Sequence, residues 1–547
     1  EMGQLHMRDT FKPRRWSELT TKEKEEVLES HMFLKQKRCG KIKGRTVAGG
    51  NKQRDFMSKE DASSPTAHTE SVLITCATDA EEERDVAIID IPNAFIQTRI
   101  TDKKHKIIIR VRGILVDLLL EIAPEVYGPF VTTTKSGEKQ LLLECQNVLC
   151  GTMIASLLYC LKFRGSLEDR AFTVNPHDPC VANRMIESKQ QTVCWHVDDC
   201  KISGVKKVND HLIEDLRSEH EQIFEDGSGK MTVSRGKKHN YLGMDLDFST
   251  PGICKVSMFD YIDEVLAAFE KAAPDAKGTK SSAAPADLLA EREDAKKLDP
   301  KRADQFHSLV AKMLFATKRA RPDTSTAIAY LTTRVRNPTT SDWRKLAHLM
   351  RYVRGTRRLP LILGSNGTSK LSWYIDAAHA VHPDMKGHSG GGLTMGRGFP
   401  VSSSTKQKLN TNSSTETELV GVHDNMPNVL WTRMFLEAQG RNVAENVVFQ
   451  DNKSAILLEK NGKASSSKRT KHINTRHFFI TDRIKKGDVS VVWCPTEDMT
   501  GDFFTKPLKG ALFRKFRDLV MGVVPHPEPR KEKPKGKSQK RKLGKSK

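Results

Sequence analysis

Two adjacent aspartates, Asp198 and Asp199, are the residues whose types and spacing most clearly indicate chemistry in this sequence. Adjacent carboxylates repel each other and are costly to bury unless a cation lies beside them. A divalent metal ion is the simplest such cation. Apolar residues at Val193 and Trp195 precede the pair and Ile202 follows it, which predicts two short strands with both carboxylates at the tip of a hairpin. A solvated acidic turn is the alternative for an isolated pair.

A third carboxylate, Asp90, ends an apolar run that begins at Val86. An acid at the end of a buried strand can reach the same metal ions as the aspartate pair. Two-metal phosphoryl transfer needs such a group of carboxylates, because it holds two ions about 3.5 to 4 Å apart between the attacking and the leaving oxygens. The three aspartates therefore predict a metal-dependent phosphoryl-transfer site.

Four further acids in the last third of the chain follow predicted strands or lie near the start of a predicted helix. They are Asp376, Glu418, Asp451 and Asp502. Acids placed in this way can converge on two magnesium ions. A single aspartate after a strand is more often a turn residue or a helix cap, so the prediction depends on the set of four. The helix that contains Glu418 is expected to begin at Ser413 or Ser414, because serine is a favourable capping residue.

The elements that must position these acids resemble those of one family. The pattern comprises Asp90, Phe95, Gly151, Val197-Asp198-Asp199, Tyr241-Leu242-Gly243-Met244 and Arg321-Pro322-Asp323. It resembles the reverse transcriptase of copia-type long-terminal-repeat retrotransposons, and the order Asp, Glu, Asp, Asp resembles that of ribonuclease H. The resemblance extends from about Leu5 to about Gly522. It implies a multidomain α/β (α+β) protein with a right-hand polymerase palm and fingers, a helical connection and a C-terminal ribonuclease H-like domain.

Composition and apolar spacing predict where these domains begin and end. We expect reverse transcriptase fingers and palm over 1–270, and a linker or mobile surface segment over 271–305, which is rich in Ala, Lys, Asp and Pro. Apolar residues at helical spacing predict a helical connection, or thumb-like segment, over 306–365. A ribonuclease H-like domain is expected over 366–524 and a disordered basic tail over 525–547.

The resemblance implies a catalytic and metal-binding role for seven acids. They are Asp90, Asp198 and Asp199 in the polymerase, and Asp376, Glu418, Asp451 and Asp502 in the ribonuclease H-like domain. Glu418 is assigned instead of the nearby Glu416, because Glu418 is followed by Leu419, as in the ribonuclease H pattern. The implied cofactor is Mg²⁺, two ions per site, for which Mn²⁺ can substitute.

Four residues are implied to contact the nucleotide or the template. Lys43 and Arg45 resemble fingers residues that bind the incoming triphosphate, and a solvated basic strand is an equally open alternative. Phe95 occupies the position of the aromatic gate that excludes a 2′-hydroxyl, although core packing would also explain a phenylalanine there. Gly151 lies in a segment that resembles the template-gripping motif.

Met153 and Ile154 depart from the family, which has a Lys-Gln pair at these positions. A polar contact near the nucleotide is therefore absent, while the metal-binding acids are all present. The implied function is RNA- and DNA-templated DNA synthesis, with degradation of the RNA strand of the hybrid. The alternative is a decayed or co-opted element copy that binds nucleic acid without catalysis.

The charge of the chain indicates a polyanionic partner. Its 90 basic and 68 acidic residues give a net charge of +22. Residues 530–547 contain ten Lys or Arg and one acid, a net of +9, so +13 remains elsewhere. The implied partners are an RNA template, a DNA primer, RNA–DNA hybrid and dNTPs, with association with the element's capsid and integrase. The implied location is cytoplasmic, in a virus-like particle, and nuclear.

Other features exclude further classes of protein. The ten cysteines form no Cys-x-x-Cys pair, which predicts a reducing compartment and no structural zinc. His379, His382 and His388 are interpreted as loop histidines. Charged residues interrupt the apolar segment 107–131, so we do not expect it to span a bilayer. The basic run 468–473 either follows a substrate backbone or is a solvated loop. Because the first residue is Glu, we expect a fragment of a longer polyprotein.

Overall fold

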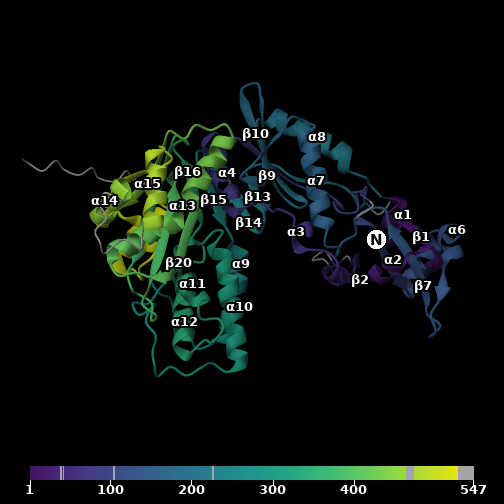
Figure 1. Cartoon of the computed structure of the whole chain (residues 1–547), viewed down its shortest axis with the longest axis horizontal. Helices are drawn as coiled ribbons and strands as arrows, with labels where there is room; N and C mark the ends of the chain where they lie inside the picture. Colours follow the sequence, from purple (N-terminus) through teal and green to yellow (C-terminus); the bar gives the residue numbers. More distant parts are fainter. Residues whose placement is uncertain (37–39, 41, 103–104, 225–226, 463–473, 528–547) are drawn as a thin grey trace, which may run out of the picture. The chain divides into compact units, whose positions relative to one another are not determined.

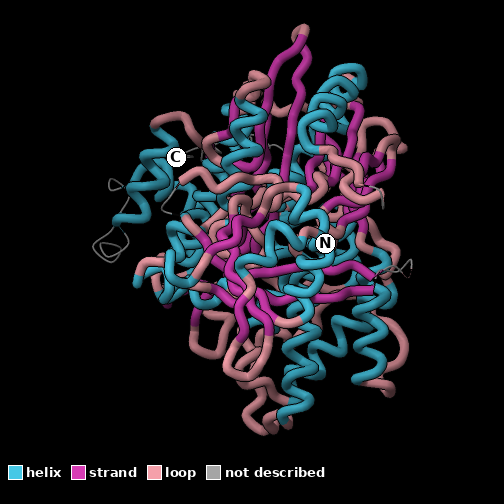
Figure 2. Tube along the Cα trace, turned by 90° about the vertical axis from the view of Figure 1, so that its right-hand side faces the viewer, coloured by secondary structure: helices cyan, strands magenta, loops and turns pink. Residues whose placement is uncertain are grey.

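The computed structural model describes residues 1–527, except for 37–39, 41, 103–104, 225–226 and 463–473 (Figure 1). The protein has a mixed α/β structure, and helices and strands both occur along most of the chain (Figure 2). The chain folds into two compact units. Unit 1 comprises Glu1–Thr75 and Glu82–Pro251, and unit 2 comprises Cys76–Glu81 and the chain from Gly252 onward.

An antiparallel sheet of unit 1 contains the two acidic segments predicted for the polymerase. In sheet order its strands are β12 (Thr232–Ser234), β4 (Asp85–Asp90), β11 (Asp199–Gly204), β10 (Lys189–His196), β9 (Asp178–Ile186) and β8 (Thr173–Asn175). Helix α8 (Lys206–His220) contacts β4 and β11. The apolar run of β4 is buried, as expected for a central strand. The strands predicted before Asp90 and on both sides of the Asp198–Asp199 pair are confirmed.

A second sheet of unit 1 is mixed, because β2 pairs in parallel with β5 while the other pairs are antiparallel. In sheet order its strands are β1 (Phe11–Arg14), β7 (Lys139–Cys145), β5 (Ile107–Arg112), β2 (Leu28–Gln36) and β3 (Ile42–Ala48), with β6 (Thr132–Thr133) beside β7. Segment 107–131 includes β5 and α5 (Ile114–Ile122), and most of their apolar residues belong to one buried core, whereas Ile114 is exposed. None of the helices that the structure describes is both long and apolar enough to cross a membrane.

Shorter elements complete unit 1. They are α1 (Met2–Met7), α2 (Thr21–Glu26), α3 (Lys59–Ala62), α6 (Pro124–Tyr127), α7 (Ala155–Glu168) and the hairpin of β13 (Lys238–Tyr241) and β14 (Met244–Asp247). Helix α4 (Thr69–Glu81) begins in unit 1, and its last residues are assigned to unit 2. The hydroxyl of Tyr241 donates a hydrogen bond of 3.0 Å to the backbone oxygen of Cys194 in β10. This bond holds the β13–β14 hairpin against the strand that leads to Asp198.

The first half of unit 2 is largely helical. Its helices are α9 (Phe259–Ala272), α10 (Pro300–Thr317), α11 (Ser325–Thr332) and α12 (Thr340–Gly355), and its strands are β15 (Cys254–Ser257), β16 (Leu361–Ser365) and β19 (Gly396–Arg397). Helix α9 contacts α10 and α12, and β15 pairs with β16. The units therefore divide at Pro251, whereas the sequence predicted a boundary at residue 270. The helices predicted from the apolar spacing over 306–358 are confirmed, while 361–365 is a strand.

The segment between α9 and α10 has no helix or strand, yet it is packed against α12. The side chains of Ala283, Leu288 and Leu289 are buried. The backbone oxygen of Ser282 lies 3.0 Å from Nε2 of His348, which belongs to α12. The interpretation of this stretch as a linker or mobile surface segment therefore needs correction. Its small and apolar residues are too irregularly spaced to indicate an element, but they are enough to anchor an extended chain on a helix.

A five-stranded sheet forms the second half of unit 2. In sheet order its strands are β20 (Val401–Asn410), β18 (Lys386–Thr394), β17 (Lys370–Ala378), β21 (Glu445–Gln450) and β22 (Ser490–Trp493). The helices of this half are α13 (Ser414–Ala438), α14 (Lys453–Asn461), α15 (Asn474–Lys485) and α16 (Gly510–Val520), with a 3-10 helix, η9 (Thr500–Phe504). Strand β17 pairs in parallel with β21 and antiparallel with β18. All three strands predicted next to acids are confirmed.

Two predictions lie outside the described residues. The basic run 468–473 falls in the segment 463–473, and nearly all of the predicted basic tail lies beyond residue 527.

Candidate metal sites

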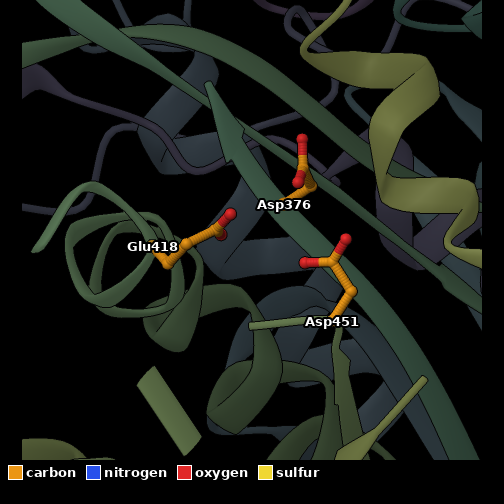
Figure 3. A group of neighbouring side chains, drawn as sticks. All are labelled: Asp376, Glu418 and Asp451. Carbon is orange, nitrogen blue, oxygen red and sulfur yellow. The ribbon is translucent and has the colours of Figure 1, made fainter. Parts of the chain in front are cut away.

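Three of the predicted acids of unit 2 meet at the end of the five-stranded sheet. Parallel strands β17 and β21 pair Tyr374 with Phe449, so Asp376 and Asp451, two residues further along, come to lie side by side. Helix α13 supplies Glu418. Each of the three residues offers one carboxylate oxygen, and these atoms all lie within 4.8 Å of one another. Figure 3 shows the three carboxylates turned toward a common space.

Two backbone features bring Glu418 to this position. The amide of Ala377 in β17 donates a hydrogen bond of 3.0 Å to Oε2 of Glu418. Gly421, one turn along α13, lets the helix approach the strand, because a Cβ at Gly421 would lie 2.8 Å from Cβ of Ala377. The side chain of Gln450 also points to Oε2 of Glu418, at 3.4 Å.

Glu416 has a different place in the structure. Ser413 caps α13 by accepting a hydrogen bond of 3.2 Å from the amide of Glu416. The carboxylate of Glu416 accepts a bond of 2.7 Å from the amide of Asn412, just before the helix. Glu416 therefore stabilises the start of the helix, as acids in a first turn do. Of the two glutamates, Glu418 is the one beside Asp376.

Burial makes this group of acids electrostatically unfavourable without a cation. Burial, together with the charges of Asp376 and Asp451, raises the pKa of Glu418 well above its usual value. Burial and the charge of Asp376 also raise the pKa of Asp451. Oxygen ligands at this spacing are those that Mg²⁺ and Mn²⁺ prefer. The residues present therefore fit a divalent cation.

Asp502, the fourth predicted acid, lies on η9, and Lys506 connects it to Asp376 through two ion pairs. Nζ of Lys506 is 2.7 Å from Oδ1 of Asp502 and 3.4 Å from Oδ1 of Asp376. The hydroxyl of Thr505 donates to the other oxygen of Asp376. Burial, followed by the charge of Asp376, raises the pKa of Asp502 to about 7.

The sequence analysis missed Lys506. Burial opposes its charge, but the carboxylates of Asp376 and Asp502 together raise the pKa of Lys506 above its usual value. The signal in the sequence was its position four residues after Asp502, which places both side chains on one face of a helical turn. Lys506 joins the first and the fourth acid of the site.

The aspartates of unit 1 share one end of the antiparallel sheet. Asp90 and Asp199 are directly opposite each other on β4 and β11. Asp198 lies in the turn between β10 and β11, and its backbone oxygen accepts a bond of 3.0 Å from the amide of Ile91. The turn also places Val197 at φ 59°, a strained conformation for a β-branched residue. The structure thus brings the three predicted aspartates of unit 1 together.

Burial and the negative charges of these aspartates raise the pKa values of neighbouring groups. Burial and the charge of Asp198 raise the pKa of Asp199. The pKa of the Cys200 thiol is raised by burial and then by all three aspartates, Asp199, Asp198 and Asp90. Asp90 itself is exposed. Within the described residues, the 4.8 Å spacing between acids is met in unit 2 and not here, so this group is the more open of the two.

Phe95 packs on Tyr159, a ring that is influenced by the charges of these aspartates. The ring of Phe95 is edge-on to Tyr159, with centroids 6.2 Å apart, and it remains half-buried. Burial and then the charges of Cys200, Asp198 and Asp90 raise the pKa of Tyr159, which places that ring within their field. Phe95 therefore has both a packing contact and an accessible part, and both interpretations of this residue stay open.

Gly151, in the predicted template-gripping segment, packs closely against the backbone of strand β3. Its φ is +89°, and a Cβ there would lie 2.4 Å from the backbone oxygen of Ala48. A Cβ at Gly50 would in turn lie 2.0 Å from the backbone oxygen of Gly151. The amide of Ala48 donates a bond of 2.9 Å to the oxygen of Cys150. Two backbones cross here at a distance that excludes any side chain.

Lys43 and Arg45 are exposed on one face of β3. Burial raises the pKa of the Cys150 thiol, while the charges of Arg45 and Lys43 lower it and that of Asp198 raises it. The same thiol thus lies within the field of both the basic strand and the aspartate turn. This placement fits phosphate binding and equally fits a solvated basic strand.

Met153 and Ile154, at the positions where the resemblance implies a polar pair, pack against the apolar core. Ile154 is fully buried, and Met153 packs against the same apolar core. The side chain of Gln53 accepts a bond of 2.8 Å from the amide of Met153. Gln53 is a polar contact to this segment that the sequence analysis did not identify, since the two residues are 100 apart in the chain.

The three histidines form no metal-spaced group among the described residues. Nε2 of His382 lies 3.0 Å from Nδ1 of His388, and His388 contacts the hydroxyl of Ser404 at 2.8 Å. Burial lowers the pKa of His382 to about 4 and that of His388 to about 3. His388 belongs to β18 and is buried, so its interpretation as a loop residue was wrong. His379 instead contacts the hydroxyl of Thr417 at 2.7 Å.

Comparison with known proteins agrees with the resemblance. The Retrovirus-related Pol polyprotein from transposon TNT 1-94 of Nicotiana tabacum is 25% identical over 491 residues, or 88% of this chain. The corresponding polyprotein from transposon RE1 of Arabidopsis thaliana is 25% identical over 486 residues, also 88%. The chain is a homologue of copia-type Pol polyproteins. The predicted resemblance is therefore confirmed.

This copia-type Pol homologue spans about a third of the length of those relatives, 34% of the first and 30% of the second. No protein-family model matches the chain. Among solved structures, apo telomerase from Candida tropicalis aligns with 61% of this chain and 58% of its own, at 10% identity and a TM-score of 0.27.

Proposed function

We propose that this copia-type Pol homologue is an RNA-directed DNA polymerase with ribonuclease H activity. The observation that carries the proposal is the gathering of the seven predicted acids into two separate groups, one in each unit. The names of the relatives support a polymerase-type role that acts on nucleic acid. Unit 1 would contain the palm and fingers, α10 to α12 the connection, and the five-stranded sheet the ribonuclease H-like domain.

In unit 1, Asp90, Asp198 and Asp199 would hold the divalent ions beside the primer terminus. Lys43 and Arg45 would bind the triphosphate of the incoming dNTP through charge-assisted hydrogen bonds. Phe95 would lie under the sugar and exclude a 2′-hydroxyl, and Gly151 would let the template backbone approach. Mg²⁺ or Mn²⁺, when bound, lowers the pKa of a hydroxyl or water and neutralises charge on the phosphoryl group.

In unit 2, Asp376, Glu418, Asp451 and Asp502 would hold the ions that serve cleavage of the RNA strand. The buried carboxylates would hold those ions in a fixed position, because Glu418 accepts a hydrogen bond from the backbone of β17. Lys506 would keep Asp376 and Asp502 in place before an ion binds. Two sites in two units allow synthesis of DNA and removal of its RNA template by one chain.

The proposed partners follow from this function and from the resemblance. They are an RNA template, a DNA primer, RNA–DNA hybrid and dNTPs. Association with the element's capsid and integrase, and a location in a cytoplasmic virus-like particle and in the nucleus, are proposed on the resemblance alone.

A second candidate is a decayed or co-opted copy that binds nucleic acid without catalysis. The observation that favours it is the replacement of a polar pair by Met153 and the buried Ile154. The presence of all seven acids favours the enzyme.

A primer-extension assay on a labelled RNA template decides between the two. With Mg²⁺ and dNTPs, the enzyme is expected to extend the DNA primer and to shorten the RNA of the resulting hybrid. Chelation of the metal should stop both reactions. Retained binding of primer–template with neither reaction, in Mg²⁺ or Mn²⁺, would favour the decayed copy.

A further inference from the structure

The Arg321-Pro322-Asp323 segment forms a buried ion pair whose role the proposed function does not explain. Arg321 donates two hydrogen bonds of 2.8 Å to the carboxylate of Asp323, and both side chains are essentially inaccessible to solvent. Tyr352 of α12 donates a third bond, of 2.7 Å, to Asp323. Nη2 of Arg321 also donates to the hydroxyl of Thr356, at 2.7 Å. Both charges are thus paired and hydrogen-bonded, as burial requires.

This network lies directly before α11, and α11 contacts the 3-10 helix that contains Asp502. The hydroxyl of Thr326 donates a buried hydrogen bond of 2.6 Å to the backbone oxygen of Phe503. Asp323, Thr326, Phe503 and Lys506 line one small cavity. Residues that precede the five-stranded sheet by many positions therefore contact the segment between Asp502 and Lys506.

Aromatic contacts strengthen the same connection. The ring of Tyr352 packs edge-on against Phe513 of α16, with centroids 5.6 Å apart, and Phe513 lies 5.3 Å from Phe503. Tyr352 thus touches both the buried ion pair and the aromatic residues that surround η9. These contacts link α11 and α12 to the 3-10 helix that contains the last acid of the metal site.

The 3-10 helix needs such support. It has five residues, and no side chain caps its N-terminus. Short 3-10 helices have poor hydrogen-bond geometry and are not stable by themselves. On the opposite side, a Cβ at Gly501 would lie 3.0 Å from the amide of Asp376, so this backbone is closely packed on β17. A shift of η9 would therefore move Asp502 relative to Asp376.

We propose that α11, anchored by Arg321, Asp323 and Tyr352, is a positioning element for the metal site of unit 2. Thr326 is its point of contact and holds η9 so that Asp502 faces Asp376. This inference rests on the proposed ribonuclease H function and extends it, since it makes the helical segment a functional part of the nuclease. A fragment that begins after α12 would retain all four acids and lack this support.

The test uses three variants of the full chain. Thr326→Val keeps the shape of the side chain and removes the hydroxyl, while Thr326→Ser keeps the hydroxyl. Thr332→Val is the matched control, because the Thr332 hydroxyl lies on the same helix and bonds to Ala329 within it, at 2.8 Å. The measurements are the Mg²⁺ dependence of cleavage of a preformed RNA–DNA hybrid, the rise in Tm on addition of Mg²⁺, and primer extension.

We expect Thr326→Val to raise the Mg²⁺ concentration for half-maximal hybrid cleavage by about tenfold, the usual effect of removing a group that orients a metal ligand. The Mg²⁺-induced rise in Tm should decrease in the same variant, because weaker binding stabilises the folded state less. Thr326→Ser and Thr332→Val should match the parent in both measurements. Primer extension should be unchanged in all three.

Two results would overturn the inference alone. One is an unchanged Mg²⁺ dependence in Thr326→Val when the parent cleaves hybrid. The other is an equal loss in Thr326→Val and Thr332→Val, which would indicate general destabilisation of α11. A parent chain that neither cleaves hybrid nor gains stability from Mg²⁺ would refute the proposed nuclease itself, and the positioning role with it.

Discussion

The two metal sites differ in how their acids are held at the level of single residues. In unit 2, Lys506 lies between Asp376 and Asp502 and partly neutralises them. In unit 1, Asp90 is exposed. Phe95, the proposed sugar gate, packs on Tyr159. Lys506 and Phe95 can each be tested by a single substitution.

Removal of the ammonium group should destabilise the metal-free protein. In Lys506→Met the carboxylates of Asp376 and Asp502 would repel each other without compensation. The expected loss is about 1 kcal/mol after allowance for solvent screening, because the Lys506 side chain is 38% exposed. Addition of Mg²⁺ should restore more stability in the variant than in the parent. Thermal unfolding with and without Mg²⁺ measures both, and Lys509→Met, at an exposed lysine three residues further along the chain, serves as the control.

Phe95→Ala should weaken discrimination between deoxyribonucleotides and ribonucleotides. If the ring is the sugar gate, its loss removes a steric clash with the 2′-hydroxyl, and discrimination should fall by at least about tenfold. Phe95→Tyr keeps the bulk and should keep the selectivity. The measurement is the ratio of kcat/KM for dNTP and rNTP on one template. Unchanged selectivity in a folded Phe95→Ala variant would leave core packing as the role of this residue.

At the level of elements, α14 contains an acid that no proposed function needs. Glu459 is fully buried, and among the described residues neither of its carboxylate oxygens has a hydrogen-bond partner. Burial raises its pKa from 4.5 to about 8. Below pH 4.5 both the folded and the unfolded states are protonated. Between pH 4.5 and pH 8, Glu459 ionises in the unfolded state but stays protonated in the folded state. The stability of the folded state therefore falls as pH rises through this range.

Glu459→Met should therefore stabilise the protein more at pH 8 than at pH 5. The side chains have similar volume, and the thioether requires no hydrogen bond. The expected difference in stabilisation between the two pH values is about 2–4 kcal/mol. Denaturant unfolding at both pH values measures it. The exposed Glu445→Gln is the control and should give the same stability change at both; an equal gain for Glu459→Met at pH 5 and pH 8 would contradict the assigned pKa.

Elements next to acids were predictable, and contacts between distant elements were not. The strands that end near Asp90, Asp376 and Asp451 are short apolar runs, and such patterns are local. The hydrogen bond from Thr326 to Phe503 joins residues 177 positions apart, and no local pattern contains that information. The packing of the segment after α9 was missed for the same reason, because its few buried residues follow no period.

The candidate sites show the same division at the level of side chains. The choice of Glu418 depended on the residue that follows it in the sequence, and the structure places that glutamate beside Asp376. The position of Lys506 four residues after Asp502 is a local signal, because that spacing places both side chains on one face of a helical turn. The burial of His388 depends on a strand of glycines and small residues, which has little apolar signal of its own.

At the level of the whole molecule, the two groups of acids belong to different compact units. Positive charge is concentrated in one segment of unit 2. Residues 301–358 contain 14 Lys or Arg and three acids, a net of +11. Most of the excess outside the basic C-terminal run therefore lies on α10 to α12 and their connections. Binding of primer–template should depend on such residues and only weakly on the acids.

Substitutions of single acids should therefore separate the two activities. Asp198→Asn is expected to reduce primer extension by more than about 100-fold, since even groups that only support metal ligands contribute about 10- to 100-fold. Cleavage of a preformed hybrid should stay near the parent rate. Asp376→Asn should give the reverse pattern, and each variant controls for the folding of the other. Loss of both activities in either variant, with binding retained, would contradict two independent sites.

The crossing of backbones at Gly50 and Gly151 has a consequence for the history of the element. A side chain at either position would collide with backbone atoms, so a base change that replaces either glycine would damage unit 1 without altering an acid. Copies of a transposon that no longer replicate accumulate such changes at the neutral rate, while replicating lineages eliminate them. Comparison of these two codons with synonymous sites among sister copies in the host genome would therefore date the loss of selection, independently of any assay on the protein.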